Sequence, residues 1–235
     1  MKLLIAIKSC HRDRDRGCHQ AIRDTWGSKV VTDVTLGFFI GRDENSGQAS
    51  WRLGDETQVD APDDYENLPL KTREILRQSI GWNYDFTFLC DNDTFVNPER
   101  LLQTGFEKFD YSGRFGVLPP VGTQFDYTDG RGIEYPGCHP WASGGVGYFL
   151  SKKAAEHIVQ FEPNIWAEDM WVGQVLGPEI QAGRINAANL STLECQAAWH
   201  FARTRRYRFY TPEMMYRSFE LGDPGVMYEQ DRKSR

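Results

Sequence analysis

The sequence predicts an α/β fold, with a Rossmann-like mixed, mostly parallel sheet flanked by helices. Apolar runs of strand length recur between segments whose apolar residues have helical spacing. The first of them, within residues 3–9, is a continuous apolar run typical of a strand buried on both faces. This alternation favours parallel pairing, because parallel strands are joined by crossover helices. The 235 residues suffice for one large domain or two small ones, with a sizeable core.

The predicted strands lie at regular intervals along the chain. They are expected at residues 3–9, 34–40, 86–90, 116–118 and 147–150. A short helix is expected at residues 20–26, where three apolar side chains have near-helical spacing. In open sheets of this class, ligands bind at the carboxyl ends of the strands. Those strand ends are therefore where chemistry is expected.

Three further helices begin at recognisable start signals. Pro69 suits the first turn of a helix. Asn97 is a helix cap, and the following Pro98 and Glu99 suit the first turn. Ser151 is expected to cap a helix that runs through residue 159. The buried side chains after the first two signals are expected to be Ile75, Leu76, Ile80, Leu101, Leu102, Phe106 and Phe109.

Two polar, glycine-bearing stretches are expected to be loops. Residues 42–54 are interpreted as a surface loop between elements. Residues 125–137 are rich in turn-forming residues, and we expect a mobile binding loop there.

Composition excludes several classes of protein. Lys plus Arg is 27 and Asp plus Glu is 33, so the formal net charge is -6. This acidity argues against nonspecific nucleic-acid binding. No apolar run approaches the roughly 20 residues that span a bilayer, and the apolar start is too short for a signal peptide.

The five cysteines do not form a recognisable metal or disulfide pattern. There is no Cys-x-x-Cys pair, so a zinc ribbon is not expected. Buried, reduced thiols are one interpretation, and a disulfide in an exported protein is another. The candidate pairs are Cys10–Cys18 and Cys138–Cys195.

A pair of carboxylates follows the third predicted strand. Asp91 and Asp93 flank Asn92, and alternate residues of an extended segment point the same way. Two carboxylates suit Mg²⁺ or Mn²⁺, and a metal there can stabilise a diphosphate leaving group. An Asp-rich turn that caps a helix is the alternative.

Three more segments have both a functional and a structural interpretation. Glu168 and Asp169 open a helix, where acidic residues also complement the helix dipole. Gly144 and Gly145 allow close backbone approach to a ligand, or form a turn. His200 is a candidate ligand of the same metal, or a packed side chain between aromatic neighbours.

Several cations could contact phosphate. Arg23 and Lys71 could each meet a nucleotide, or form an ordinary surface ion pair. A C-terminal arginine run could pair with phosphates, or form a solvated face. It consists of Arg203, Arg205, Arg206 and Arg208.

Six segments, taken together and in order, resemble one enzyme family. They include Arg23-Asp24-Thr25-Trp26, Asp91-Asn92-Asp93 and Glu168-Asp169, and they span most of the chain. The chain is similar to glycosyltransferase family 31, which contains β-1,3-galactosyltransferases, β-1,3-N-acetylglucosaminyltransferases, core 1 synthases and Fringe. The matching residues are 21–27, 38–41, 60–72, 91–96, 143–151 and 168–173.

This resemblance implies a GT-A fold and a UDP-sugar-dependent, inverting β-1,3-glycosyltransferase. Galactose or N-acetylglucosamine would move to a hydroxyl of a glycan acceptor, with Mn²⁺ or Mg²⁺ as cofactor. The whole chain, residues 1–235, would be one catalytic domain. Its nucleotide-binding half would cover about residues 1–110, and its acceptor-binding half about residues 111–235.

The resemblance also implies roles for individual residues. Asp91, Asp93 and His200 would hold the metal. Asp169 would be the catalytic base, and Glu168 beside it is expected to raise its pKa. Contacts to the nucleotide or sugar are expected from Ser9, Arg23, Lys71, Asp91, Asn92, Asp93, Gly144 and Gly145.

Two other functional classes and two locations stay open. A glycoside hydrolase would place two carboxylates on either side of a glycosidic bond. A noncatalytic UDP-sugar or glycan-binding module would keep the fold without turnover. The resemblance is compatible with a cytoplasmic bacterial or viral enzyme, or with an excised domain of a Golgi-lumenal enzyme.

Overall fold

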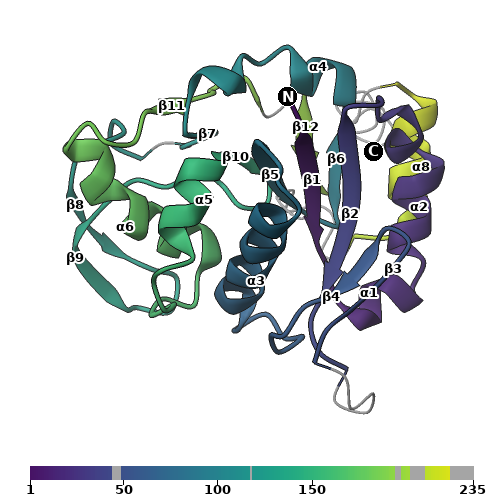
Figure 1. Ribbon diagram of the computed structural model, residues 1–235, viewed down its shortest axis with the longest axis horizontal. Coiled ribbons are helices and arrows are strands. Elements are labelled where there is room, and N and C mark those ends of the chain that lie inside the picture. The colour runs from purple at the N-terminus through teal and green to yellow at the C-terminus, as the bar shows by residue number, and fades with distance from the viewer. Residues whose placement is uncertain (44–48, 117, 194–196, 202–209, 223–235) are drawn as a thin grey trace, which may run out of the picture.

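The computed structural model describes residues 1–43, 49–116, 118–193, 197–201 and 210–222. Its centre is an eight-stranded sheet in the order β11-β7-β10-β5-β1-β2-β4-β3 (Figure 1). These strands are β1 (Leu3–Lys8), β2 (Val34–Ile40), β3 (Trp51–Leu53), β4 (Glu56–Gln58), β5 (Phe86–Asp91), β7 (Tyr111–Gly113), β10 (Tyr148–Ser151) and β11 (Ala187–Asn189).

The central strands of this sheet are parallel. β1 pairs in parallel with β2 and β5, and β2 with β4, whereas β10 and β3 pair antiparallel to their neighbours. In the β1–β5 register Lys8 lies opposite Asp91. The carboxyl ends of these strands are therefore level, and the predicted α/β fold with a mixed, mostly parallel sheet is confirmed.

Two helical layers cover the sheet. α3 (Leu68–Gly81), α5 (Lys152–Ile158) and α6 (Glu168–Gln181) contribute to one core cluster. α2 (Cys18–Asp24) and α8 (Pro212–Glu220) contribute to the other. Leu3, Ile5 and Ile7 of β1 belong to the α2–α8 side, and Leu4 and Ala6 to the opposite side. Both faces of β1 are thus buried, as its continuous apolar run predicts.

Local start signals predicted the helices well. The Asn97 side chain accepts a hydrogen bond from Arg100 N at 3.1 Å and caps α4 (Pro98–Leu102). The Ser151 hydroxyl accepts one from Ala154 N at 3.2 Å and caps α5. α4 ends at Leu102, Gly105 then takes a left-handed φ of 74°, and Phe106 is buried in η2 (Phe106–Lys108) instead.

The strand expected at residues 116–118 is wrong. The strand of this region is β7, which ends at Gly113. Gly116 has a φ of 62°, a left-handed conformation that interrupts extended backbone. Residue 117 lies outside the described part of the chain. Short apolar stretches in loops and short strands look alike in sequence.

The two expected loops also contain strands. β8 (Phe125–Thr128) and β9 (Glu134–Cys138) form an antiparallel hairpin, which lies beside α6 in Figure 1. The prediction of a loop at 125–137 is therefore wrong, because turn-forming residues concentrate at the tip while the arms pair. Residues 42–54 contain β3, and residues 44–48 lie outside the described part.

A second small sheet joins the C-terminal region to the centre of the chain. β12 (Ala198–His200) pairs antiparallel with β6 (Thr94–Val96), with His200 opposite Thr94. Phe201 N also donates to Asp93 O at 3.1 Å. This pairing brings His200 to the segment that follows β5.

The structure bears on two expectations, one about the pairing of cysteines and one about membrane-spanning helices. Cys10, Cys18, Cys90 and Cys138 are free thiols, so the structure has no Cys10–Cys18 bridge. Cys195 lies outside the described residues, as does the candidate pair that includes it. Among the helices that the structure describes, none combines the length and apolarity that crossing a membrane requires.

Candidate functional site

Three predicted metal ligands meet where β5 ends. Asp91, Asp93 and His200 each offer one ligand atom, and these atoms lie within 4.8 Å of one another. His200 Nε2 is 3.2 Å from Asp93 Oδ1 and 3.9 Å from Asp91 Oδ2. β5 supplies Asp91, the turn after it supplies Asp93, and β12 supplies His200.

The donor set of this cluster fits a divalent cation. Asp93 Oδ1 is buried and, among the described residues, accepts no hydrogen bond of good geometry. Burial opposes a charge on His200, but Asp93 and Asp91 outweigh it and raise the pKa of His200. Two carboxylates and an imidazole that converge in this way can bind Mn²⁺ or Mg²⁺, with the imidazole favouring Mn²⁺.

Gly145 leaves the space that His200 occupies. A Cβ on Gly145 would lie 2.4 Å from His200 Cε1. The Gly145 carbonyl accepts a hydrogen bond from Thr94 Oγ1 at 2.6 Å, which fixes the backbone there. Gly145 therefore packs directly against the predicted metal cluster, where close backbone approach requires a glycine.

Gly144 connects this cluster to the predicted base. Its N–H donates to Asp169 Oδ2 at 2.9 Å, and Met170 N donates to Asp169 Oδ1 at 2.8 Å. Burial and the charge of Glu168 raise the pKa of Asp169 to about 6. The direction predicted for Glu168 is confirmed. A half-buried carboxylate with this pKa is suited to accept a proton near neutral pH.

A buried lysine links the two acidic segments. Lys8 Nζ is 3.2 Å from Asp91 Oδ1 and donates to Glu168 Oε2 at 2.9 Å. Burial opposes the charge of Lys8, but Asp91 and Glu168 outweigh it and raise the lysine pKa. Glu168 Oε1 also accepts hydrogen bonds from Thr72, at 3.1 Å, and from the Tyr148 hydroxyl.

Sequence reasoning did not identify Lys8 as part of the site. The only signal was its position at the carboxyl end of an otherwise apolar strand. A charge there is costly unless it is paired, and its partner on α6 is 160 residues away along the chain.

A pocket of about 440 Å³ adjoins the metal cluster. Ser9 and Lys71, both predicted nucleotide contacts, line this pocket together with Asp91, Asn92 and Asp93. Asn92 Nδ2 donates to Ser9 Oγ at 2.9 Å. The structure therefore brings these five predicted residues to one cavity.

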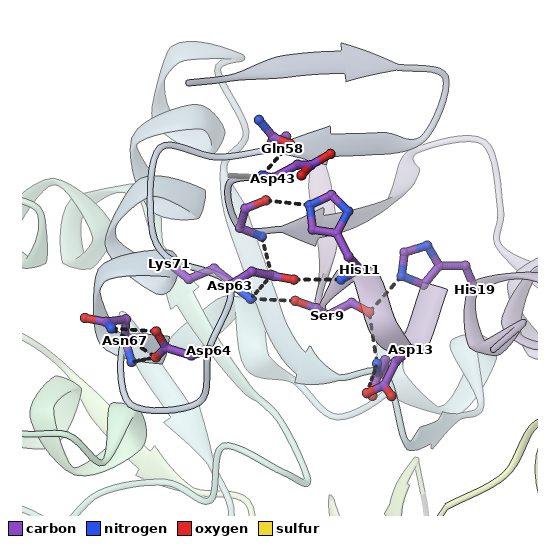
Figure 2. A network of polar contacts seen from close by, with 12 residues as sticks. Ser9, His11, Asp13, His19, Asp43, Gln58, Asp63, Asp64, Asn67 and Lys71 are labelled. Carbon is purple, nitrogen blue, oxygen red and sulfur yellow. Dashed lines mark hydrogen bonds and ion pairs between the residues drawn. The ribbon is translucent and has the colours of Figure 1, made fainter. Parts of the chain in front are cut away.

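Lys71 has protein partners within this pocket. Its ammonium donates to Ser9 O at 2.6 Å and to Asp63 Oδ1 at 2.8 Å (Figure 2). Asp63 also accepts from His11 N at 2.7 Å and from Gly41 N at 2.6 Å. Asp63 was not predicted as a site residue, and it organises the pocket wall by joining three segments.

Arg23 lies apart from the pocket-lining side chains. It forms ion pairs with Asp55 at 2.7 Å and Glu56 at 2.8 Å, which raise its pKa. Glu56 accepts from His19, whose other ring nitrogen is 2.7 Å from Ser9 Oγ. Arg23 is thus connected to the pocket only through other side chains. The predicted arginine cluster at 203–208 lies outside the described residues.

The amino-acid sequence matches a known family over part of the chain and several related proteins over most of it. Residues 18–112 match the galactosyltransferase family. β-1,3-Galactosyltransferase 5 of Pan troglodytes is 28% identical over 205 residues, covering 74% of this chain and 65% of that protein. The human protein of the same name is 27% identical, with 74% and 62% covered.

A relative named for the transfer of a different sugar gives a similar match. UDP-GalNAc:β-1,3-N-acetylgalactosaminyltransferase 1 of Mus musculus is 27% identical over 198 residues, covering 73% of this chain and 58% of that protein. The chain spans less than two thirds of the length of these relatives. The matches confirm the resemblance that the motifs predicted, and the mixed α/β architecture is consistent with a GT-A fold.

Proposed function

From the match of residues 18–112 to the galactosyltransferase family, we propose that this chain is a UDP-sugar-dependent β-1,3-glycosyltransferase. The observation that carries the proposal is the meeting of Asp91, Asp93 and His200 beside a pocket, with Asp169 close by on α6. The relatives are named as β-1,3-transferases, which supports a β-1,3 product.

The metal dependence in this proposal rests on the chain's own donors. Asp91, Asp93 and His200 would hold Mn²⁺, or Mg²⁺, and the bound cation would neutralise the diphosphate of the donor. Ser9, Asn92 and Lys71 would line the nucleotide end of the pocket. The nucleotide half of the domain would then be about residues 1–110.

Asp169 would act as the base of an inverting displacement. The acceptor oxygen attacks the anomeric carbon as the bond from that carbon to the diphosphate oxygen breaks, and Asp169 takes the hydroxyl proton. The hydrogen bonds from Gly144 and Met170 hold the carboxylate in one orientation. Oriented groups of this kind lower the barrier by avoiding reorganisation during the reaction.

The resemblance and the names of the relatives indicate the classes of donor sugar and acceptor. Galactose or N-acetylglucosamine is the proposed sugar, and the relative that uses UDP-GalNAc adds N-acetylgalactosamine. The acceptor is a glycan hydroxyl, held by about residues 111–235. The relatives come from animals, which supports the Golgi-lumenal alternative over a bacterial or viral cytoplasmic one.

The first experiment is thermal unfolding with UDP, with and without Mn²⁺. A ligand at 100 times its Kd adds about 2.7 kcal/mol of stability. We expect a shift that requires both UDP and Mn²⁺, and its loss in Asp93→Ala. No shift in a folded wild-type sample would refute the proposed donor site.

Turnover separates this proposal from its two rivals. Sugar transfer from a UDP-sugar to an added glycan acceptor, dependent on Mn²⁺, supports the transferase. Binding of UDP and Mn²⁺ without transfer would indicate a noncatalytic module. Metal-independent release of sugar from a glycoside would indicate a hydrolase.

A further inference from the structure

Two aromatic side chains form a pair at the pocket, one on a segment that lines it and one on the segment that leads into the predicted base. Tyr65 lines the pocket together with Asp91 and Asp93, yet its side chain is 68% exposed. Its ring centroid is 6.1 Å from that of Trp166, with an angle of 48° between the planes. Trp166 lies three residues before Asp169. Tyr65 is exposed and Trp166 is partly buried, so this aromatic pair is open to a ligand mainly on the Tyr65 side.

The tip of the β8–β9 hairpin holds Trp166 in place. Asp129 Oδ2 accepts a hydrogen bond from Trp166 Nε1 at 3.0 Å. The Arg131 guanidinium lies 3.7 Å from the centre of the Trp166 ring. Both contacts fix the plane of the indole, because one satisfies its N–H and the other covers a face.

The same arginine reaches the segment that carries Tyr65. Arg131 donates to both carboxylate oxygens of Glu66, at 2.9 and 2.7 Å. Two parallel hydrogen bonds of this kind define orientation better than a single ion pair. The hairpin tip therefore bridges the Tyr65 segment before α3 and the Trp166 segment before α6.

The chemistry around the rings suits a sugar rather than an apolar partner. A pyranose ring presents C–H groups on its faces, which pack on aromatic rings, and hydroxyl groups at its edge, which need polar partners. The carboxylates of Asp91 and Asp93 line the same pocket as Tyr65. Burial and the charges of Asp91 and Asp169 raise the pKa of Tyr65.

We propose that Tyr65 and Trp166 form a stacking platform for a pyranose ring of the acceptor glycan, held in register by Arg131. The assignment rests on the proposed transferase function, and it places the acceptor beside Asp169. Uracil of the donor is the other ring that could stack on Tyr65, so the experiment separates the two.

The test compares saccharide binding with nucleotide binding. Saturation-transfer NMR with lactose and with N-acetyllactosamine measures contact with the aromatic rings, and calorimetry measures the Kd of UDP with Mn²⁺. In Tyr65→Ala we expect saccharide binding to weaken roughly tenfold while the UDP Kd stays within about twofold. Tyr65→Phe keeps the ring and should bind both as the wild type does. Phe161→Ala removes an exposed ring elsewhere and is the matched control.

Each outcome decides one question. Loss of UDP binding in Tyr65→Ala would assign the ring to uracil and overturn the platform. Unchanged saccharide binding in that variant, or no binding of either saccharide by the wild type, would overturn it as well. If the wild type binds a saccharide through Tyr65 but transfers no sugar, the platform stands and the proposed function fails. If it transfers sugar and the acceptor KM is unchanged in Tyr65→Ala, the function stands and the platform fails.

Discussion

A methyl group at Gly145 should disable the predicted metal site by displacing one ligand. The Cβ of Gly145→Ala would lie 2.4 Å from Cε1, 2.5 Å from Nδ1 and 2.8 Å from Nε2 of His200. Carbon atoms in contact prefer about 3.5–4.0 Å, so the imidazole must move by about 1 Å. Metal–ligand distances tolerate only about 0.2 Å. The displaced imidazole therefore cannot remain a ligand.

The expected result is weaker Mn²⁺ binding in an otherwise folded protein. Changes in groups that orient a ligand typically cost about 10–100-fold in metal affinity, and we expect a loss of that size in Gly145→Ala. The assay is calorimetric titration of Mn²⁺ at fixed UDP. Gly81→Ala is the matched control, because its Cβ meets nothing within 4 Å and Gly81 does not have a left-handed φ.

A double-variant cycle tests whether the effect passes through His200. If it does, adding Gly145→Ala to His200→Ala should change Mn²⁺ affinity little further, because the displaced ligand is already gone. An unchanged Mn²⁺ titration in Gly145→Ala would refute the reasoning. Full additivity of the two substitutions would refute it as well, since it would place the effect of Gly145 elsewhere.

The remaining predictions concern the base, the carboxylate ligand and the buried lysine. Asp169→Asn should retain UDP binding but lose roughly 10²–10⁴-fold in kcat, and wild-type turnover in this variant would exclude Asp169 as the base. Since the pKa of Asp169 is raised to about 6, its base form grows as pH rises; kcat at saturating substrate and metal should increase about tenfold from pH 5 to 7 and then level off. A flat profile in the wild type, or the same rise in Asp169→Asn, would contradict this. Asp93→Ala should abolish the Mn²⁺-dependent part of UDP binding, and an unchanged Mn²⁺ titration would exclude Asp93 as a ligand. Lys8→Met should leave Glu168 buried without its cation, and the free energy of unfolding in urea should fall by about 3–5 kcal/mol; adding Glu168→Gln should restore part of that loss, and its failure to do so would contradict the pairing argument.

Short-range patterns were enough for much of the framework. The caps at Asn97 and Ser151 follow from side-chain chemistry within three residues of each helix start. The continuous apolar run of β1 predicts that both of its faces are buried, and they are. Asp91 and Asp93 could be predicted to share a site because alternate residues of extended backbone point the same way.

Local patterns failed where glycine conformation or turn composition decided the outcome. Gly116 interrupts the expected strand through a left-handed φ of 62°, which its neighbours do not predict. The turn-forming residues of 125–137 concealed two paired arms, because hairpin pairing depends on cross-strand contacts as well as on turn residues. Arg23 could not be placed from sequence, since its partners Asp55 and Glu56 are more than 30 residues away.

The sequence by itself determined the central strands β1, β2 and β5, the helix caps at Asn97 and Ser151 and the two carboxylates at the end of β5. These features depend on neighbours within a few residues, where backbone periodicity and capping chemistry operate. Only the tertiary structure decided that His200 meets Asp93, that Lys8 pairs with Glu168 and that Arg131 joins Glu66 to Trp166. Those contacts join residues 35 to 160 positions apart, and such pairs are selected by strand register and by the need to neutralise buried charge, which no local pattern encodes.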